Sequence, residues 1–218
     1  MGIDFLEIIQ LAIILLVSIG LHEYAHAYVS YKLGDPTPKL QNRLTPNPLK
    51  HLDPIGFLMI FLINFGRGKP VQVNPMYYKN PLKGELMVAL AGPATNLILS
   101  TIGIIIILIY SKILGYSITS ILQTNTDIVN IFRLKFSIIN IALAIFNMIP
   151  IPPLDGFRII KMLRFKASQI IEKYTIYISI AFLLIILGPG QSIVGNFLSK
   201  TSFFIFNILF TIFGNIFY

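Results

Sequence analysis

Five long apolar stretches constrain the fold of this chain more than any other feature of its sequence. They run over Phe5–Tyr31, Leu86–Tyr110, Phe136–Ile149, Ile170–Leu187 and Ser202–Tyr218. Several reach the roughly 20 residues that cross a bilayer as an α-helix. Hydrophobic residues make up 55% of the 218 residues and charged residues only 12%, which is too apolar for a water-soluble globule. We therefore predict an all-α polytopic membrane protein that contacts the lipid bilayer through four or five spans.

The basic residues predict how these spans are oriented. The net charge of +8 could indicate a nucleic-acid partner, but 13 of the 17 Lys and Arg residues fall in two connections, at 32–83 and 158–173. Because cytoplasmic loops of membrane proteins carry the excess of Lys and Arg, we place both connections in the cytoplasm and expect no nucleic acid. The amino terminus, with Asp4 and Glu7, then faces out, and its apolar run is too long for a signal peptide and should be retained.

One apolar piece is too short to cross the membrane. Residues 55–65 number only eleven, so we interpret them as a re-entrant or interfacial segment within a basic loop at 32–84. The surrounding sequence is rich in Pro and Asn, and the stretch KPVQVNP has the alternation of an edge strand. We therefore expect about five to six transmembrane or re-entrant helices and a short β-rich region on the cytoplasmic side. A single domain, 1–218, would hold helices at 5–31, 86–110, 128–165 (broken), 170–188 and 200–218.

The stretch LHEYAH lies inside the first apolar run and contains two of the chain's three histidines. His22 and His26 are four residues apart, so both rings lie on one face of a helix with Glu23 beside them. This is the H-E-x-x-H pattern, in which two histidines hold zinc and the glutamate handles the proton of a water molecule. Ionisable residues near the bilayer centre cost about 2.5–3.5 kcal/mol each and usually serve function. The structural alternative is histidines that hydrogen-bond to neighbouring helices.

A catalytic zinc ion usually takes three protein ligands, and the chain has no cysteine to provide one. Asp155 is the best-placed carboxylate, because it follows three prolines in FNMIPIPPLDGFRII that must end the preceding helix. A broken helix at membrane depth indicates a binding site. Spacing alone leaves a second interpretation equally open, in which Asp155 caps an amphipathic helix on the cytoplasmic surface.

Together these motifs resemble the site-2 protease family of intramembrane zinc metalloproteases. H-E-x-x-H on an apolar helix is followed more than a hundred residues later by N-x-x-P-x-x-P-L-D-G. RLTPNPLKHLDPIG and ALAGPATN are similar to segments of the small bacterial and archaeal members that lack a PDZ domain. The resemblance covers Leu21 to about Arg158. One small departure is Phe157, where the family commonly has glycine.

The resemblance implies a reaction and a set of site residues. His22, His26 and Asp155 would hold one Zn²⁺ per chain, Glu23 would activate the water, and Asn147 would contact the substrate or the oxyanion. The substrate would be a membrane protein, cut within or near a transmembrane helix during regulated intramembrane proteolysis. The enzyme would lie in the cell membrane as a multi-pass protein, with its active site toward the cytoplasm. The sequence does not indicate an oligomeric state.

Two alternatives stay open at this level. The third histidine, His51 in KHLDP, could coordinate zinc, although we favour an anchor for the loop or a gate beside the site. The chain could also be a non-catalytic zinc-binding or zinc-transporting membrane protein. A carrier, however, needs no glutamate beside its histidines, and the sequence lacks the paired inverted halves common in transporters.

Overall fold

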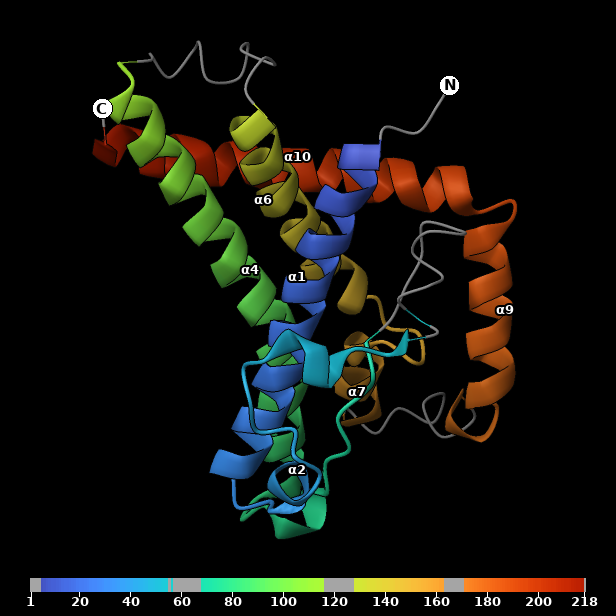
Figure 1. The fold of residues 1–218 in the computed structure, drawn as a ribbon. Helices are drawn as coiled ribbons and strands as arrows, with labels where there is room; N and C mark the ends of the chain where they lie inside the picture. The colour runs from blue at the N-terminus through green and yellow to red at the C-terminus, as the bar shows by residue number, and fades with distance from the viewer. Residues whose placement is uncertain (1–4, 55, 57–67, 116–127, 163–170, 218) are drawn as a thin grey trace.

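Every regular element that the computed structural model describes is helical, as predicted (Figure 1). The described residues are 5–54, 56, 68–115, 128–162 and 171–217. The helices are α1 (Phe5–Lys32), α2 (Thr37–Leu40), η1 (Pro48–His51), η2 (Pro75–Tyr77), α4 (Pro81–Ile113), α6 (Ile128–Asn147), α7 (Asp155–Met162), α9 (Thr175–Leu187) and α10 (Gln191–Phe217).

Three of the described helices, α1, α4 and α10, are long and apolar enough to cross a membrane. The predicted total of five to six transmembrane or re-entrant helices is not confirmed. Helix α9 has only 13 residues and is about 20 Å long, short of the roughly 30 Å hydrocarbon core. The segment predicted to be re-entrant, 55–65, lies outside the described residues apart from Gly56.

Helices α1, α4 and α6 form the centre of the molecule, with α4 running opposite to the other two (Figure 1). Close packing depends on residues without large side chains. A Cβ added at Gly103 of α4 would collide with the Ser137 hydroxyl of α6, and one at Gly20 of α1 would lie 2.5 Å from the Cβ of Pro48 in η1. The small size of Gly20 thus lets η1 pack directly against α1, half a turn before His22.

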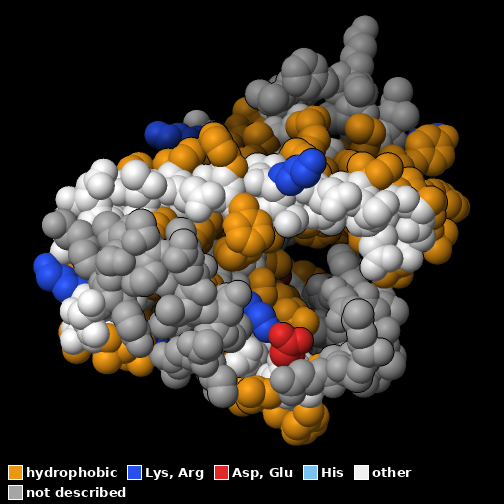
Figure 2. Space-filling model, turned by 90° about the horizontal axis from the view of Figure 1, so that it is seen from above, with side chains coloured by type: hydrophobic (Ala, Val, Ile, Leu, Met, Phe, Trp, Pro, Cys, Tyr) orange, Lys and Arg blue, Asp and Glu red, His pale blue; other side chains and the backbone are white. Residues whose placement is uncertain are grey.

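Helix α10 crosses the upper part of this bundle at a steep angle (Figure 1). Its Phe206 and Phe210 are stacked, with ring centroids 5.6 Å apart, and both are buried against α4 and α6. The apolar cluster that they join contains Ile104, Ile107, Leu108 and Ile141. The exposed side chains of α10 include those of Phe197, Phe203, Phe204, Ile208 and Ile212, and the face in Figure 2 has few charged side chains. This surface suits contact with lipid.

The predicted β-rich loop is not confirmed in the described residues, which contain no strand and only one isolated bridge, between Leu52 and Gly68. The physical reason is that backbone N–H groups of the KPVQVNP stretch already donate hydrogen bonds to groups outside any strand. The N–H of Lys69 donates to the His51 carbonyl (2.8 Å), and the N–H of Val71 donates to the Glu23 carboxylate (3.0 Å). Since Pro70 has no N–H, few donors remain for a partner strand.

Asp35 fixes the loop to the end of α1. Its buried carboxylate accepts hydrogen bonds from the Ser30 hydroxyl (2.7 Å) and from the backbone N–H groups of Thr37 (2.9 Å) and Asn74 (2.7 Å). Burial alone would raise the pKa of Asp35, but these donors outweigh it and hold the pKa below its ordinary value. The chain is therefore held at Val71 by Glu23 and at Asn74 by Asp35.

The predicted helix break is present between α6 and α7. Residues 148–154 separate the two helices, and Asp155 is the first residue of α7. Gly156 is required here, because a Cβ at this position would lie 2.5–2.6 Å from backbone atoms of Met148 and Ile149. The predicted helix at 86–110 lies inside α4, which begins earlier because the Asn80 side chain caps it by accepting from the Lys83 N–H (3.1 Å).

Candidate metal site

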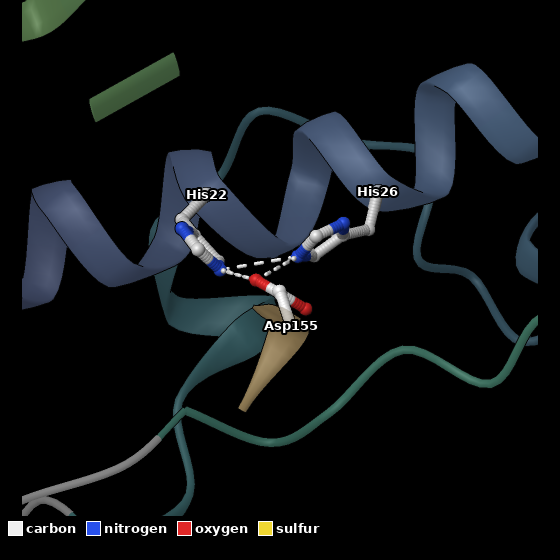
Figure 3. Close-up of side chains that lie close together, drawn as sticks. All are labelled: His22, His26 and Asp155. Atoms are coloured by element: carbon white, nitrogen blue, oxygen red, sulfur yellow. Dashed lines mark hydrogen bonds and ion pairs between the residues drawn. The ribbon is translucent and has the colours of Figure 1, made fainter. Parts of the chain in front are cut away.

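Three residues from two helices far apart in the sequence converge on one point (Figure 3). The Nε2 atoms of His22 and His26 are 3.1 Å apart. Oδ2 of Asp155 lies 3.1 Å from the first and 3.2 Å from the second. All three side chains are buried. Among the described residues they form the group of His, Asp and Glu side chains whose ligand atoms could hold a metal ion.

The second nitrogen of each imidazole faces a hydrogen-bond acceptor. His22 Nδ1 donates to the side-chain oxygen of Asn96 (2.6 Å), and His26 Nδ1 donates to the backbone carbonyl of Val88 (2.7 Å). Because both acceptors require the proton on Nδ1, both Nε2 atoms present a lone pair toward Asp155. Outer hydrogen bonds of this kind orient metal-binding histidines and raise their basicity.

The donor set fits zinc. Two Nε2 lone pairs and a carboxylate oxygen are three acceptors at mutual distances of 3.1–3.2 Å, an arrangement that repels itself unless a cation lies between them. Tetrahedral ligands about 2.0–2.2 Å from a zinc ion would lie roughly 3.4 Å from one another, close to these separations. Three protein ligands leave the fourth position open, as in catalytic zinc sites.

A buried polar network supports His22 from behind. The Asn96 amide donates to the Asn140 side-chain oxygen (2.9 Å), and the Asn140 amide donates to the hydroxyl of Ser18 (2.9 Å). All three side chains are 0% exposed, so the network links α1, α4 and α6 inside apolar surroundings. Sequence reasoning missed Asn96 and Asn140 as site residues. The available signal was an asparagine within an apolar helix, in ALAGPATN and in SIINIAL.

Gly92 of α4 gives the site its space. A Cβ at this position would lie 2.5 Å from Nε2 of both His22 and His26. Pro93 follows it and interrupts the hydrogen bonds of α4, since proline has no N–H. Any side chain at position 92 would occupy the place where the ligand atoms meet.

Glu23 lies on the same helix as the two histidines, and its carboxylate is turned toward the loop. Its Oε2 accepts the Val71 N–H (3.0 Å), and Val71 is buried. A Cβ on Gly68 would lie 3.3 Å from the Cγ of Glu23, so the loop backbone passes directly over this side chain. The loop thus fixes the orientation of the predicted proton carrier, a contact that the sequence did not reveal.

The structure does not bring the Asn147 side chain into a hydrogen bond with the three converging residues. Its amide donates to the Leu143 carbonyl one turn back in α6 (3.0 Å). Asn147 is the last residue of α6 and precedes the break that leads to Asp155. Its contact with a substrate or an oxyanion remains a prediction.

His51 is buried but lies outside the group of three. Its Nε2 donates to the Thr45 carbonyl (2.9 Å), and its own carbonyl accepts the Lys69 N–H. Arg43 donates to the neighbouring Lys50 carbonyl (2.6 Å). These contacts fit the interpretation of His51 as a loop anchor better than direct coordination of the metal.

Comparison with known proteins agrees with this chemistry. The sequence model of peptidase family M50 matches residues 10–137 and 118–186. "Putative zinc metalloprotease YwhC" of Bacillus subtilis (strain 168) is 40% identical over 189 residues, which cover 84% of this chain and 83% of that protein. "Putative zinc metalloprotease Rip2" of Mycobacterium tuberculosis (strain H37Rv) is 28% identical over 148 residues, or 65% of this chain and 52% of that protein.

A third relative matches over a smaller part of its own length. "Zinc metalloprotease MJ0392" of Methanocaldococcus jannaschii is 30% identical over 151 residues, 69% of this chain but only 33% of its own length. No solved structure matches the chain. The family match, the extent of the similarity to YwhC and the apolar helices together show that this chain is a membrane protein of peptidase family M50, the site-2 protease family.

Proposed function

We propose that this protein is an intramembrane zinc metalloendopeptidase that hydrolyses peptide bonds within or near transmembrane helices of other membrane proteins. One observation supports the proposal most strongly. Two imidazole nitrogens and a carboxylate oxygen meet at 3.1–3.2 Å inside a bundle of apolar helices, with Glu23 on the same helix as the imidazoles. Such a site can bind and activate water where the surrounding solvent is lipid.

His22, His26 and Asp155 would hold one Zn²⁺ per chain. When bound, zinc supplies a Lewis acid that polarises a carbonyl and lowers the pKa of its water to about 7. Glu23 takes a proton from the attacking water and passes it to the leaving amine, as base and then acid. Val71 holds the Glu23 carboxylate in one orientation for both steps. Asn147 would donate a hydrogen bond to the oxyanion after releasing the Leu143 carbonyl.

The site would face the cytoplasm. His22 lies ten residues from Lys32 at the end of α1, or about 15 Å along the helix, and the basic loop begins there. This loop contacts Glu23 through Val71, so a substrate arriving from the same side meets the loop first. A transmembrane substrate must unwind before its peptide bond is accessible, since helical carbonyls are already hydrogen-bonded. We propose that the unwound chain enters past this loop.

The substitution Glu23→Gln tests the proposal. Purified wild-type and variant proteins in detergent are given fluorescein-labelled casein, an unfolded chain that needs no unwinding. Co-expressed single-span membrane proteins are also examined for a shortened product. We expect the variant to keep its zinc and to lose cleavage of both. Equal cleavage by the two proteins, or none by either, would reject proteolysis. Zinc flux across vesicles by both would instead support the carrier.

A further inference from the structure

His51 is held more rigidly than a loop residue normally requires. It is 1% exposed, at the end of η1, and η1 is pressed against Gly20 of α1. The Asn47 side chain accepts the Leu49 N–H (3.0 Å) and begins the η1 turn. Arg43 is only 5% exposed, and its guanidinium donates a hydrogen bond to the Lys50 carbonyl. The stretch RLTPNPLKHLDP is therefore built to fix one imidazole in one place.

One nitrogen of that imidazole is unused. Nε2–H donates to the Thr45 carbonyl, which leaves Nδ1 as an acceptor. Nδ1 is buried and has no hydrogen-bond partner within the described part of the chain. Burial lowers the pKa of His51, and the nearby Arg43 charge adds to this, so the ring is neutral at pH 7 and its lone pair is available. Buried polar atoms of this kind usually have a partner, often water.

The unused nitrogen belongs to a residue close to Glu23. Gly68 lies between the two, since a Cβ there would be 3.4 Å from the His51 carbonyl and 3.3 Å from the Glu23 Cγ. Residue 68 is also bridged to Leu52, directly after His51. The Glu23 charge is near enough to raise the pKa of His51 slightly, against the larger effect of burial. Glu23 Oε2 is engaged by Val71, and its other carboxylate oxygen can face a water molecule.

We propose that Nδ1 of His51 accepts a hydrogen bond from a water molecule held between His51 and Glu23, so that His51 is a positioning residue for the proton carrier. The inference rests on the proposed function. Such a water would have two polar partners, the unpaired His51 Nδ1 and the Glu23 carboxylate, as buried waters require. It would keep Glu23 hydrogen-bonded and oriented while protons move between the attacking water and the leaving amine.

Two substitutions separate the two nitrogens. In His51→Gln the amide reaches the place of Nε2 and still donates to Thr45, but nothing replaces the Nδ1 lone pair. In His51→Asn the side-chain oxygen takes the place of Nδ1 and accepts a hydrogen bond, but the Thr45 anchor is lost. Zinc content and the thermal unfolding midpoint are measured for both variants, the wild type and Glu23→Gln. The kcat and KM for labelled casein are then measured at a temperature below all four unfolding midpoints.

We expect His51→Gln to keep the zinc, KM and unfolding midpoint of the wild type while kcat falls about 10- to 100-fold, the usual cost of removing an outer hydrogen bond of a metal site. His51→Asn should unfold at lower temperature but retain most of kcat. Wild-type kcat in His51→Gln would show that His51 is only an anchor and overturn the inference. Loss of zinc in His51→Gln would overturn it too. Equal rates for wild type and Glu23→Gln would instead reject the proposed function.

Discussion

The first half of helix α4 contacts the histidines of the candidate metal site, whereas its second half packs into the apolar core. In its first half, Val88, Gly92 and Asn96 face the histidines, and the buried imidazole Nδ1 atoms there have acceptors at 2.6–2.7 Å. In its second half, Ile104, Ile107 and Leu108 pack against α6 and α10. The hydroxyl of Ser111 in that half has no partner among the described residues.

This contrast shows how one apolar helix can serve two purposes. The first half is specified by directional hydrogen bonds and by space that must stay empty, so a single atom in the wrong place changes the site. The second half is specified by volume, so it tolerates polar mismatches and responds to the loss of packing. Changes in the first half should therefore alter zinc binding, and changes in the second half should alter stability.

Gly92→Ala, in the first half of α4, should have the largest effect and should abolish most of the zinc binding. The added methyl occupies the place where both Nε2 atoms meet, so zinc affinity should fall by more than the 10- to 100-fold that outer-shell changes cost. The helix itself gains from alanine, by up to about 1 kcal/mol. Titration with a zinc-chelating dye measures the affinity. Gly195→Ala in α10, where a Cβ meets nothing within 4 Å, is the matched control and should leave affinity unchanged.

Phe206→Ala in α10 should destabilise the packing around the second half of α4. Removing a buried aromatic ring costs about 3–5 kcal/mol, so the free energy of unfolding in mild detergent should fall by that amount. Zinc affinity of the folded fraction should stay near that of the wild type. A parallel loss of affinity would show that the two halves of α4 are not independent.

Asn96→Leu should weaken zinc binding by about 10- to 100-fold, because His22 loses the acceptor that orients it. Asn96→Asp keeps an acceptor for His22 and should recover most of the affinity. Chelator competition on both variants provides the measurement. Similar affinity in Asn96→Leu and wild type would mean that Gly92 and the helix backbone alone position the ring.

Asp35 extends the comparison to pH. Its folded-state pKa is depressed, so its contribution to stability is present above the unfolded pKa of about 3.9 and is lost as pH falls through the lower folded value. Asp35→Asn should cost about 1–3 kcal/mol at pH 7. Unfolding free energies measured from pH 7 to pH 3 should decline below pH 4 in the wild type more steeply than in the variant. Equal slopes would contradict this role.

Ser202→Ala should have the smallest effect. The Ser202 hydroxyl is buried on α10 and lacks a hydrogen-bond partner in the described residues. Its removal should leave stability unchanged or raise it by up to about 1 kcal/mol, since no hydrogen bond is lost. The free energy of unfolding of Ser202→Ala, measured in the same experiment as that of Phe206→Ala, tests this prediction. A clear loss of stability would reveal a partner for the hydroxyl.

The sequence predicted those parts of the site that depend on local spacing. His22 and His26 share a helix face because they are four residues apart, and the prolines before Asp155 require a break. These features need no knowledge of how the helices pack. The pairing of Asp155 with the histidines rested on family resemblance, and the structure brings the three together.

The sequence could not predict contacts set by packing. Asn96 meets His22, and Val71 meets Glu23, only because particular helices and loops settle in one register. The predicted strand in KPVQVNP had the right alternation, but two of its N–H groups donate to the side chains of Glu23 and Asp35 rather than to another strand. The predicted span count likewise differs at α9, whose 13 residues are too few to cross a bilayer, and at α6, which is not among the three candidate spans of the described residues.

The central claim is that His22, His26 and Asp155 together hold one zinc ion. The most direct test is elemental analysis of the purified wild-type protein and of the single alanine variants at these three positions. The account predicts one zinc per chain in the wild type and loss of most of the metal in each variant, with the variants still folded. A wild-type protein without stoichiometric metal, or an Asp155→Ala variant that keeps its full complement, would contradict it.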